Sequence, residues 1–306
     1  ENFDRLPDTF PMSLTIILIC LIAERFLLDH SELRDNGWFS AYCQWLERHQ
    51  LPQWLRQGPV GILLLTLPPL LALWTVQYLF EDTLSGLLWF ATSVAILLYC
   101  LGPNDLDTLV NRYMKAVDSD EDSEIRASAA ALIQDEPPTS EPARSQAVAE
   151  GILFQANQNL FSVLFWFILL GPIGAMAYRI ATWLPTIDQA KQDPDFLLNS
   201  KQLVVILDWI PARITAFCYA IAGSFEDALY GWRNYKDSRF SEFDDSNSGT
   251  LICTGGGAMR LSTLINEAHE GVQSFSFLAK SAMALVWRSL VIYLLIVTLL
   301  TFSGLI

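Results

Sequence analysis

Long apolar runs separated by short polar segments dominate this chain. Four runs contain no charge or a single arginine: Val60–Phe80, Leu84–Gly102, Leu160–Trp183 and Ser289–Ile306. A helix rises about 1.5 Å per residue and a bilayer core is roughly 30 Å thick, so runs of about 20 residues are long enough to cross it. The pattern therefore predicts an all-α, polytopic integral membrane protein.

Two further apolar runs carry charged residues. Met12–Leu28 contains Glu24 and Arg25 near its end, and these side chains either reach water at the membrane interface or join a structural ion-pair network. The second of these runs is Leu203–Gly223. Counting both runs, we expect about five or six membrane-embedded helices, together with amphipathic cytoplasmic helices.

Leu203–Gly223 is apolar except for Asp208 and Arg213, which lie on either side of Pro211. Five residues apart on an ideal helix, the two side chains point about 140° away from each other unless the proline bends the helix. A charged residue at membrane depth is a candidate functional group. The alternative is a structural ion pair that ties this helix to Tyr178 and Arg179.

The polar segments divide the chain into six parts. Basic residues in Asp29–Gly58 and in Ser224–Lys280 predict that both segments are cytoplasmic. The expected parts are an N-terminal extension at 1–11; a membrane helix, an interfacial amphipathic helix and a transmembrane hairpin at 12–102; an acidic cytoplasmic helical segment at 103–152; membrane helices at 153–223; a cytoplasmic loop and helix at 224–288; and a last transmembrane helix at 289–306.

Composition narrows the classes of function. The chain is 52% hydrophobic with a formal net charge of -14, which argues against a nucleic-acid partner. The five cysteines form no C-x-x-C pair and the three histidines lie far apart, so neither a metal site nor a catalytic triad is indicated. We expect no catalytic residue, no metal and no cofactor, with membrane lipids as partners.

Two short motifs partly resemble ion-binding loops, one for calcium and one for phosphate. The acidic run Asp118–Glu124 lacks the glycine and the closing glutamate of a calcium loop, which favours a solvated turn. Gly255–Gly257 precedes a helical pattern from Met259 to Gln273, and a glycine-rich turn at a helix N-terminus can hold phosphate. No Gly-Lys-Ser/Thr follows, so a flexible loop is the favoured interpretation.

The stretch Gln155–Leu184 combines an apolar helix with polar groups that a lipid anchor does not need. Amides including Gln155 and Asn159 precede it, Gly171 and Pro172 interrupt it, and Tyr178 and Arg179 lie near its end. A helix that packs against others around a polar pocket would use all of these residues.

Four segments carry a resemblance to a known family. They read LFWFILLGPIGAMAYR at Leu164–Arg179, LDWIPARITAF at Leu207–Phe217, ERFLLDH at Glu24–His30 and DLDTLVNRYMKAV at Asp105–Val117. Together with the order of segments, they resemble AmpE, a family of bacterial inner-membrane proteins associated with inducible β-lactamase regulation. That family in turn resembles the membrane-bound adenosylcobinamide-phosphate synthases.

The chain departs from the synthase pattern at several polar positions. Gln134-Asp135-Glu136 stands where the synthases show Arg-Asp-Thr, and amides or apolar residues occupy the places of other acids. Asp135, Asp208 and Arg213 remain. Because an amide cannot act as a base and is a poorer ligand for a hard cation, the comparison predicts a retained pocket without the synthase chemistry.

The resemblance implies a non-catalytic regulatory or signalling protein, a pseudoenzyme of AmpE type in the bacterial inner membrane. It would take part in β-lactamase induction and cell-wall recycling, with a functional link to a cytoplasmic amidase. One alternative is an amide-forming synthase that depends on ATP and Mg²⁺, and another is transport of an amphiphilic metabolite. The candidate residues for a ligand or partner pocket are Glu24, Arg25, Asp135, Gln155, Asn159, Tyr178, Arg179, Asp208 and Arg213.

Overall fold

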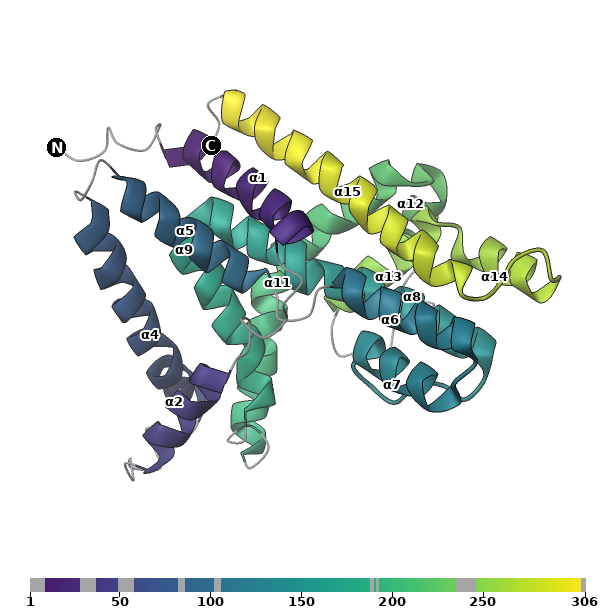
Figure 1. Cartoon of the computed structure of the whole chain (residues 1–306), viewed down its shortest axis with the longest axis horizontal. Coiled ribbons are helices and arrows are strands. Elements are labelled where there is room, and N and C mark those ends of the chain that lie inside the picture. Colours follow the sequence, from purple (N-terminus) through teal and green to yellow (C-terminus); the bar gives the residue numbers. More distant parts are fainter. Residues whose placement is uncertain are drawn as a thin grey trace. The chain divides into compact units, whose positions relative to one another are not determined.

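Helices make up most of the described part of the chain (Figure 1). The computed structural model describes residues 9–27, 37–48, 58–81, 86–101, 106–187, 190, 193–234 and 246–303. Within these ranges all regular structure is helical, which confirms the predicted all-α class.

Two compact units divide the helices between them. The first contains residues 1–103, 162–208 and 301–306, and the second contains residues 104–161 and 209–300. The helices of the first unit are α1 (Thr9–Leu27), α2 (Gly37–Arg48), α4 (Gly58–Glu81), α5 (Leu87–Cys100), α9 (Ser162–Trp183), the short η4 (Leu184–Thr186) and the beginning of α11 (Pro194–Ala222).

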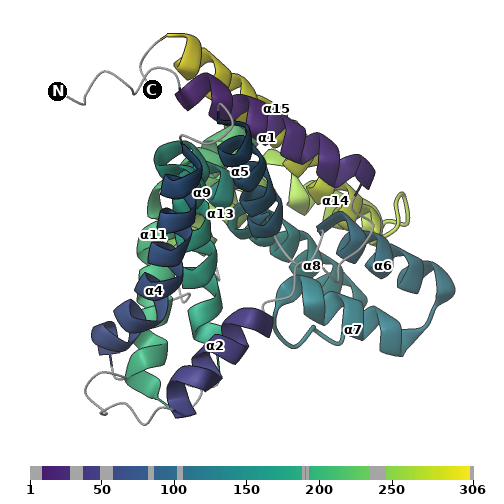
Figure 2. The same ribbon diagram turned by 60° about the vertical axis from the view of Figure 1, so that its left-hand side comes forward.

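Helix α9 is the centre of the first unit, because α1, α4 and α5 all pack against it. The views in Figures 1 and 2 show α5 beside α9. The amphipathic helix α2 buries Phe39 and Cys43 in a cluster with Trp183, whereas its Trp45 is exposed. The sequence predicted this helix from tryptophans spaced among charges, and the structure places its apolar face on the end of α9.

The second unit holds the remaining helices, which are α6 (Leu106–Ser119), α7 (Asp122–Ile133), α8 (Glu141–Ala156), the π-helical turn η3 (Asn157–Phe161), α12 (Phe225–Asn234), α13 (Ser246–Ala258), α14 (Leu261–His269), most of α15 (Phe277–Phe302) and the end of α11. Helices α6 and α7 lie side by side, and α7 and α13 each pack on α8 (Figure 2). The apolar residues that recur at helical spacing in the acidic segment, such as Val110 and Ile125, are buried.

Several helices are long and apolar enough to cross a membrane. Among the described residues these are Gly58–Leu79, the continuous run Glu141–Thr186, Pro194–Ala222 and Phe277–Phe302, and the shorter apolar helices are Leu14–Ala23 and Leu87–Cys100. Large apolar side chains on α4 remain exposed, as lipid-facing residues do. The chain is a multi-pass membrane protein. The helix that carries the last predicted span begins at Phe277, before the charge-free run from Ser289.

The long apolar stretch is broken where the sequence places Gly171 and Pro172. It begins with the π-helical turn η3, and α9 breaks at Gly171, whose φ of 67° and ψ of -157° are not helical. Only glycine adopts these dihedrals without strain, and a residue before proline disfavours the helical region. Pro172 then opens the second half of α9, since proline suits the first turn of a helix.

The structure of the glycine run Gly255–Gly257 also differs from the one predicted from the sequence. Gly255–Gly257 lie inside α13, so the expected flexible loop is wrong. A Cβ on Gly257 would lie 2.3 Å from the carbonyl oxygen of Asp227, because α12 and α13 pack with their backbones in close approach. The glycines serve helix packing here, and a pattern of apolar periodicity does not reveal that use.

Candidate functional site

The first unit contains a buried carboxyl group. Asp208 on α11 is 3% exposed, and its Oδ1 accepts hydrogen bonds from the hydroxyls of Ser162 at 2.6 Å and Tyr178 at 2.8 Å. Both donors come from α9, one from each side of the break at Gly171. Burying a carboxyl group is costly unless hydrogen bonds satisfy it, and these two hydroxyls do so.

Pro211 shapes the helix around this carboxyl group. Proline has no N–H, so the carbonyl of Leu207, four residues earlier, loses its usual partner within α11. The indole Nε1–H of Trp166 donates to that carbonyl at 3.3 Å. Leu207 is therefore bound to α9 through its backbone carbonyl, and Asp208 through its side chain.

Arg179 is 3% exposed, and its guanidinium group lies against a helix end. Its Nε donates to the carbonyl oxygen of Cys100 at 2.8 Å, and one Nη contacts the same oxygen. Cys100 is the last residue of α5, where carbonyl groups lack helical partners and the helix dipole favours a cation. These contacts explain Arg179 as a structural cap that joins α9 to α5.

The second unit holds a group of buried amides near the start of η3. Arg213 lies over the ring of Trp209 at 4.1 Å from its centroid, and its Nη1 donates to Oδ1 of Asn247 at 3.0 Å. The hydroxyl of Thr215 donates to Oδ1 of Asn157 at 2.8 Å, and both residues are fully buried. A π-helical turn often marks a functional segment, and here it presents Asn157 to α11.

Two candidate residues lie at the end of α7. The amide nitrogen of Gln155 donates to the carbonyl oxygens of Ala131 at 2.9 Å and Leu132 at 2.6 Å, which caps that helix. A carboxylate could not donate these bonds. Asp135, just beyond the helix, is exposed and accepts a bond from the N–H of Glu136.

Three candidates remain, which are Asn159, Glu24 and Arg25. Asn159 lies in η3 and is partly buried. Glu24 and Arg25 belong to α1, but their side chains lie outside the described residues. Of the nine predicted residues, the structure thus joins Tyr178 directly to Asp208.

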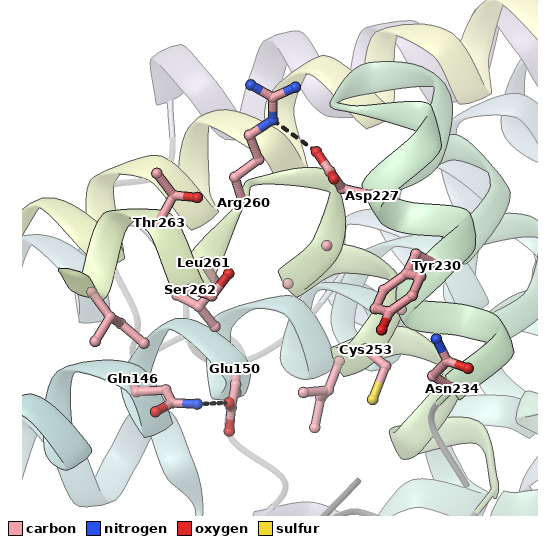
Figure 3. Close-up of a pocket in the computed structure, with 15 residues that line it drawn as sticks. Gln146, Glu150, Asp227, Tyr230, Asn234, Cys253, Arg260, Leu261, Ser262 and Thr263 are labelled. Atoms are coloured by element: carbon pink, nitrogen blue, oxygen red, sulfur yellow. Dashed lines mark hydrogen bonds and ion pairs between the residues drawn. The ribbon is translucent and has the colours of Figure 1, made fainter. Parts of the chain in front are cut away.

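An open cavity of about 710 Å³ lies in the second unit (Figure 3). We call it the acidic cavity, because Glu150 and Asp227 line it with one cation, Arg260. Its lining residues are Gln146, Glu150, Asp227, Tyr230, Gly231, Asn234, Ile252, Cys253, Gly256, Gly257, Arg260, Leu261, Ser262, Thr263 and Ile265. This volume is typical of pockets for small molecules.

Two hydrogen-bonded pairs mark opposite sides of the view in Figure 3. On α8, the amide nitrogen of Gln146 donates to Oε1 of Glu150 at 2.8 Å. On the other side, Arg260 Nε lies 2.8 Å from Asp227 Oδ2. The hydroxyl of Ser224 and the guanidinium of Arg260 both donate to Asp227, and they hold the pKa of that carboxyl below its usual value.

The acidic cavity has the groups that amide chemistry on a phosphorylated substrate would use. Arg260 and the first turn of α14, including Ser262 and Thr263, line it, and the first amides of a helix favour phosphate oxygens. Glu150 is 7% exposed and offers a carboxyl group that could accept a proton. Among the described residues no group of three acidic, histidine or cysteine side chains could hold a metal alone. Mg²⁺ commonly binds through one or two carboxylates together with substrate phosphates, so this donor set remains compatible with it.

The sequence reasoning missed Glu150, Asp227 and Arg260. Gln146 and Glu150 are four residues apart, which places them on one face of a helix, and that spacing was an available signal. Asp227 and Arg260 are far apart in the chain, and no local pattern joins them.

Curated relatives agree on one process. The chain is 26% identical over 209 residues to "Cobalamin biosynthesis protein CobD" of Stutzerimonas stutzeri (strain A1501), and 27% identical over 209 residues to the protein of the same name of Chromobacterium violaceum. Each match covers 67% of this chain, and 66% and 64% of the respective relatives. The match thus spans slightly less than two thirds of the relatives' own length.

These relatives overturn the main functional expectation. A non-catalytic AmpE-type regulator of β-lactamase induction is wrong, because the similar proteins are named for cobalamin biosynthesis, and the synthase alternative fits them better. The expectation rested on acids lost from motif positions such as Gln155. Acids at other positions, Glu150 and Asp227, line a cavity that the motifs did not indicate.

The match to a whole family covers more of this chain than the match to either relative. No solved structure matches this chain. The sequence pattern of the CobD/Cbib protein family matches residues 17–272, which include α8, α9, α11 and the helices of the acidic cavity. This chain belongs to the CobD/Cbib family.

Proposed function

We propose that this chain is an amide-forming membrane enzyme of cobalamin assembly that uses ATP and Mg²⁺. Membership of the CobD/Cbib family and the names of two relatives support the process. For this chain, the proposal is supported by the acidic cavity. A buried glutamate, an arginine and the start of a helix without a side-chain cap all line it.

The chemistry assigns a task to each part of the cavity. Joining a carboxylate to an amine needs the free energy of ATP, and the attacking amine must lose a proton. Glu150, held by Gln146, is our candidate to accept that proton. Arg260 and the first-turn amides of α14 would hold phosphate oxygens, and Mg²⁺ would bind mainly through phosphate and a cavity carboxylate.

The buried groups in the membrane-spanning helices have a different task in this proposal. Asp208, with Ser162 and Tyr178, holds the two halves of α9 against α11. We treat Asp208 as a positioning residue, since its hydrogen bonds are made within the protein. The proposed proton transfer therefore involves Glu150 of the second unit and not Asp208.

Genetic complementation tests the proposal in a cell. A bacterial strain that lacks its own CobD relative would be supplied with the full chain and grown where growth depends on corrinoid assembly. We expect growth with the wild type and with Glu141→Gln, because Glu141 is exposed at the start of the same helix α8. We expect no growth with Glu150→Gln.

A purified system separates the enzyme from indirect effects. The full chain in detergent would be incubated with ATP, Mg²⁺, a corrinoid carboxylic acid and an amino-alcohol phosphate, and the products would be weighed by mass spectrometry. We expect a product with the summed mass of acid and amine less one water, formed only with ATP. The absence of both this product and complementation would reject the proposed function.

A further inference from the structure

A second cavity, of about 380 Å³, lies where α11 ends and α15 begins its apolar part. We call it the arginine cavity. Its lining residues are Ala222, Gly223, Ser224, Ala258, Met259, Arg260, Leu264, Ser281, Ala284 and Arg288. All of them belong to the second unit.

The charges around the two cavities are opposite. The arginine cavity is lined by two arginines and two serines, and no aspartate or glutamate is among its lining residues. The acidic cavity shares Arg260 but adds Glu150 and Asp227. An anion in the arginine cavity would meet Arg288 and also Arg260, whose charge Asp227 partly balances, whereas in the acidic cavity it would face Glu150 and Asp227 directly.

The two guanidinium groups have donors to offer. Arg288 donates its Nε to the carbonyl of Ala284 at 3.2 Å, and within the described part of the chain its Nη groups make no hydrogen bond. Arg260 donates its Nε to Asp227 and one Nη to the hydroxyl of Ser224 at 3.4 Å. Phosphate oxygens are strong acceptors for such donors, because charge-assisted bonds are stronger than neutral ones.

The face of α15 that lines this cavity continues as an apolar stripe. Ser281 and Arg288 are seven residues apart, and Val291, Leu295, Leu299 and Phe302 follow on the same face at helical spacing. All four apolar side chains are exposed. On a helix long and apolar enough to span a membrane, such a stripe faces lipid chains.

We propose that the arginine cavity binds the headgroup phosphate of an anionic phospholipid, with its acyl chains along the apolar stripe of α15. Basic pockets at the ends of membrane helices suit such headgroups, and each nearby arginine adds to the attraction. A soluble phosphate would use the two arginines but would gain nothing from the stripe. The joint presence of charge and stripe therefore favours a lipid.

The test measures lipid selectivity directly. The purified full chain in a non-ionic detergent would be titrated with short-chain phosphatidylglycerol or phosphatidylcholine, and bound lipid would be counted by native mass spectrometry. We expect phosphatidylglycerol to bind more tightly, Arg288→Gln to weaken it about fivefold, and Arg260→Gln with Arg288→Gln to weaken it roughly 25-fold. Lys280→Gln is the matched control, because Lys280 is exposed on the same helix outside the cavity.

Three outcomes would overturn the proposal. These are equal affinity for the two lipids, an effect of Lys280→Gln as large as that of Arg288→Gln, and displacement of phosphatidylglycerol by an equal concentration of inorganic phosphate. The last outcome would indicate a site for a soluble anion. Lipid binding is measured without amide formation. The test of the lipid site is therefore independent of the test of the proposed activity.

Discussion

Asp208 and Glu150 are both carboxyl groups on helices, but their surroundings differ. Asp208, in the first unit, is bonded to two hydroxyls of α9 and lies inside the packed helices. Glu150, in the second unit, is held by one amide of its own helix and lines an open cavity. Both are less than a tenth exposed, so burial alone does not separate their tasks.

The partners of each carboxyl group separate those tasks better. The hydrogen bonds to Asp208 come from another helix, so losing them changes how α9 and α11 pack. The bond from Gln146 to Glu150 comes from the preceding turn of α8, and it orients a side chain that lines the acidic cavity. We infer that Asp208 contributes mainly to stability and Glu150 mainly to ligand chemistry.

The largest expected effect is the loss of Asp208. Asp208→Ala leaves the hydroxyls of Ser162 and Tyr178 without their buried acceptor, which we expect to cost about 3 kcal/mol of folding free energy. For a chain of this size that corresponds to a fall of roughly 6–12 °C in apparent Tm. Thermal unfolding of the detergent-solubilised protein, followed by tryptophan fluorescence, measures it. An unchanged Tm would contradict the structural task.

Glu150→Gln should have the opposite profile. The amide keeps the size of the side chain, so we expect the apparent Tm to stay within about 2 °C of the wild type. Loss of the proton acceptor should lower the rate of amide formation about 100-fold. Rate and Tm would be measured on the same preparation, beside Glu141→Gln. A full rate in Glu150→Gln would remove the distinction between the two carboxyl groups.

Much of the helical layout could be predicted from the sequence, because it depends on local patterns. Charge-free runs located α4 and α5, and apolar spacing located α6 and α7. The break at Gly171 was visible as a Gly-Pro pair, but its dihedrals depend on packing as well. Gly255–Gly257 were wrongly predicted to form a loop, because glycine is used both in loops and where helices pack closely.

The candidate site was predictable only where its members share a segment. Asp208 could be identified as a charge in an apolar run, yet its donor Ser162 is one hydroxyl among many. Arg179 was taken for a pocket residue, but its acceptor is a backbone carbonyl, and a sequence does not display backbone acceptors. The pairing of Asp227 with Arg260 joins residues separated by α13 and depends on the tertiary fold.

Tyr178 offers a finer test of the same comparison. Tyr178→Phe removes one of the two hydroxyls on Asp208 and should cost about 1.5–2 kcal/mol. Tyr113→Phe is the matched control, because Tyr113 is equally buried and its hydroxyl lies 3.4 Å from that of Ser145. We expect it to cost about 0.5–1 kcal/mol. Equal falls in Tm for Tyr178→Phe and Tyr113→Phe would mean that the bond to Asp208 stabilises the fold no more than the contact with Ser145.

The smallest expected effect concerns the exposed acid of the acidic cavity. Hydrogen bonds from Ser224 and Arg260 lower the pKa of Asp227 in the folded state. A carboxyl group whose folded pKa is lowered adds stability above its unfolded pKa, near 4, and that contribution is lost as pH falls through the folded value. Asp227→Asn should therefore lower the apparent Tm slightly at neutral pH, and this difference from the wild type should shrink as the pH falls below about 4.

The measurement is a series of thermal scans between about pH 3 and pH 7 on wild type and variant. Asp118→Asn is a suitable control, because Asp118 is exposed and has no hydrogen bond or ion pair in the described structure. If Asp227→Asn and the wild type lose stability in parallel as the pH falls, Asp227 has no net attraction to Arg260. Arg260 would then be bound only weakly to Asp227, and its contribution to the arginine cavity would be the more important one.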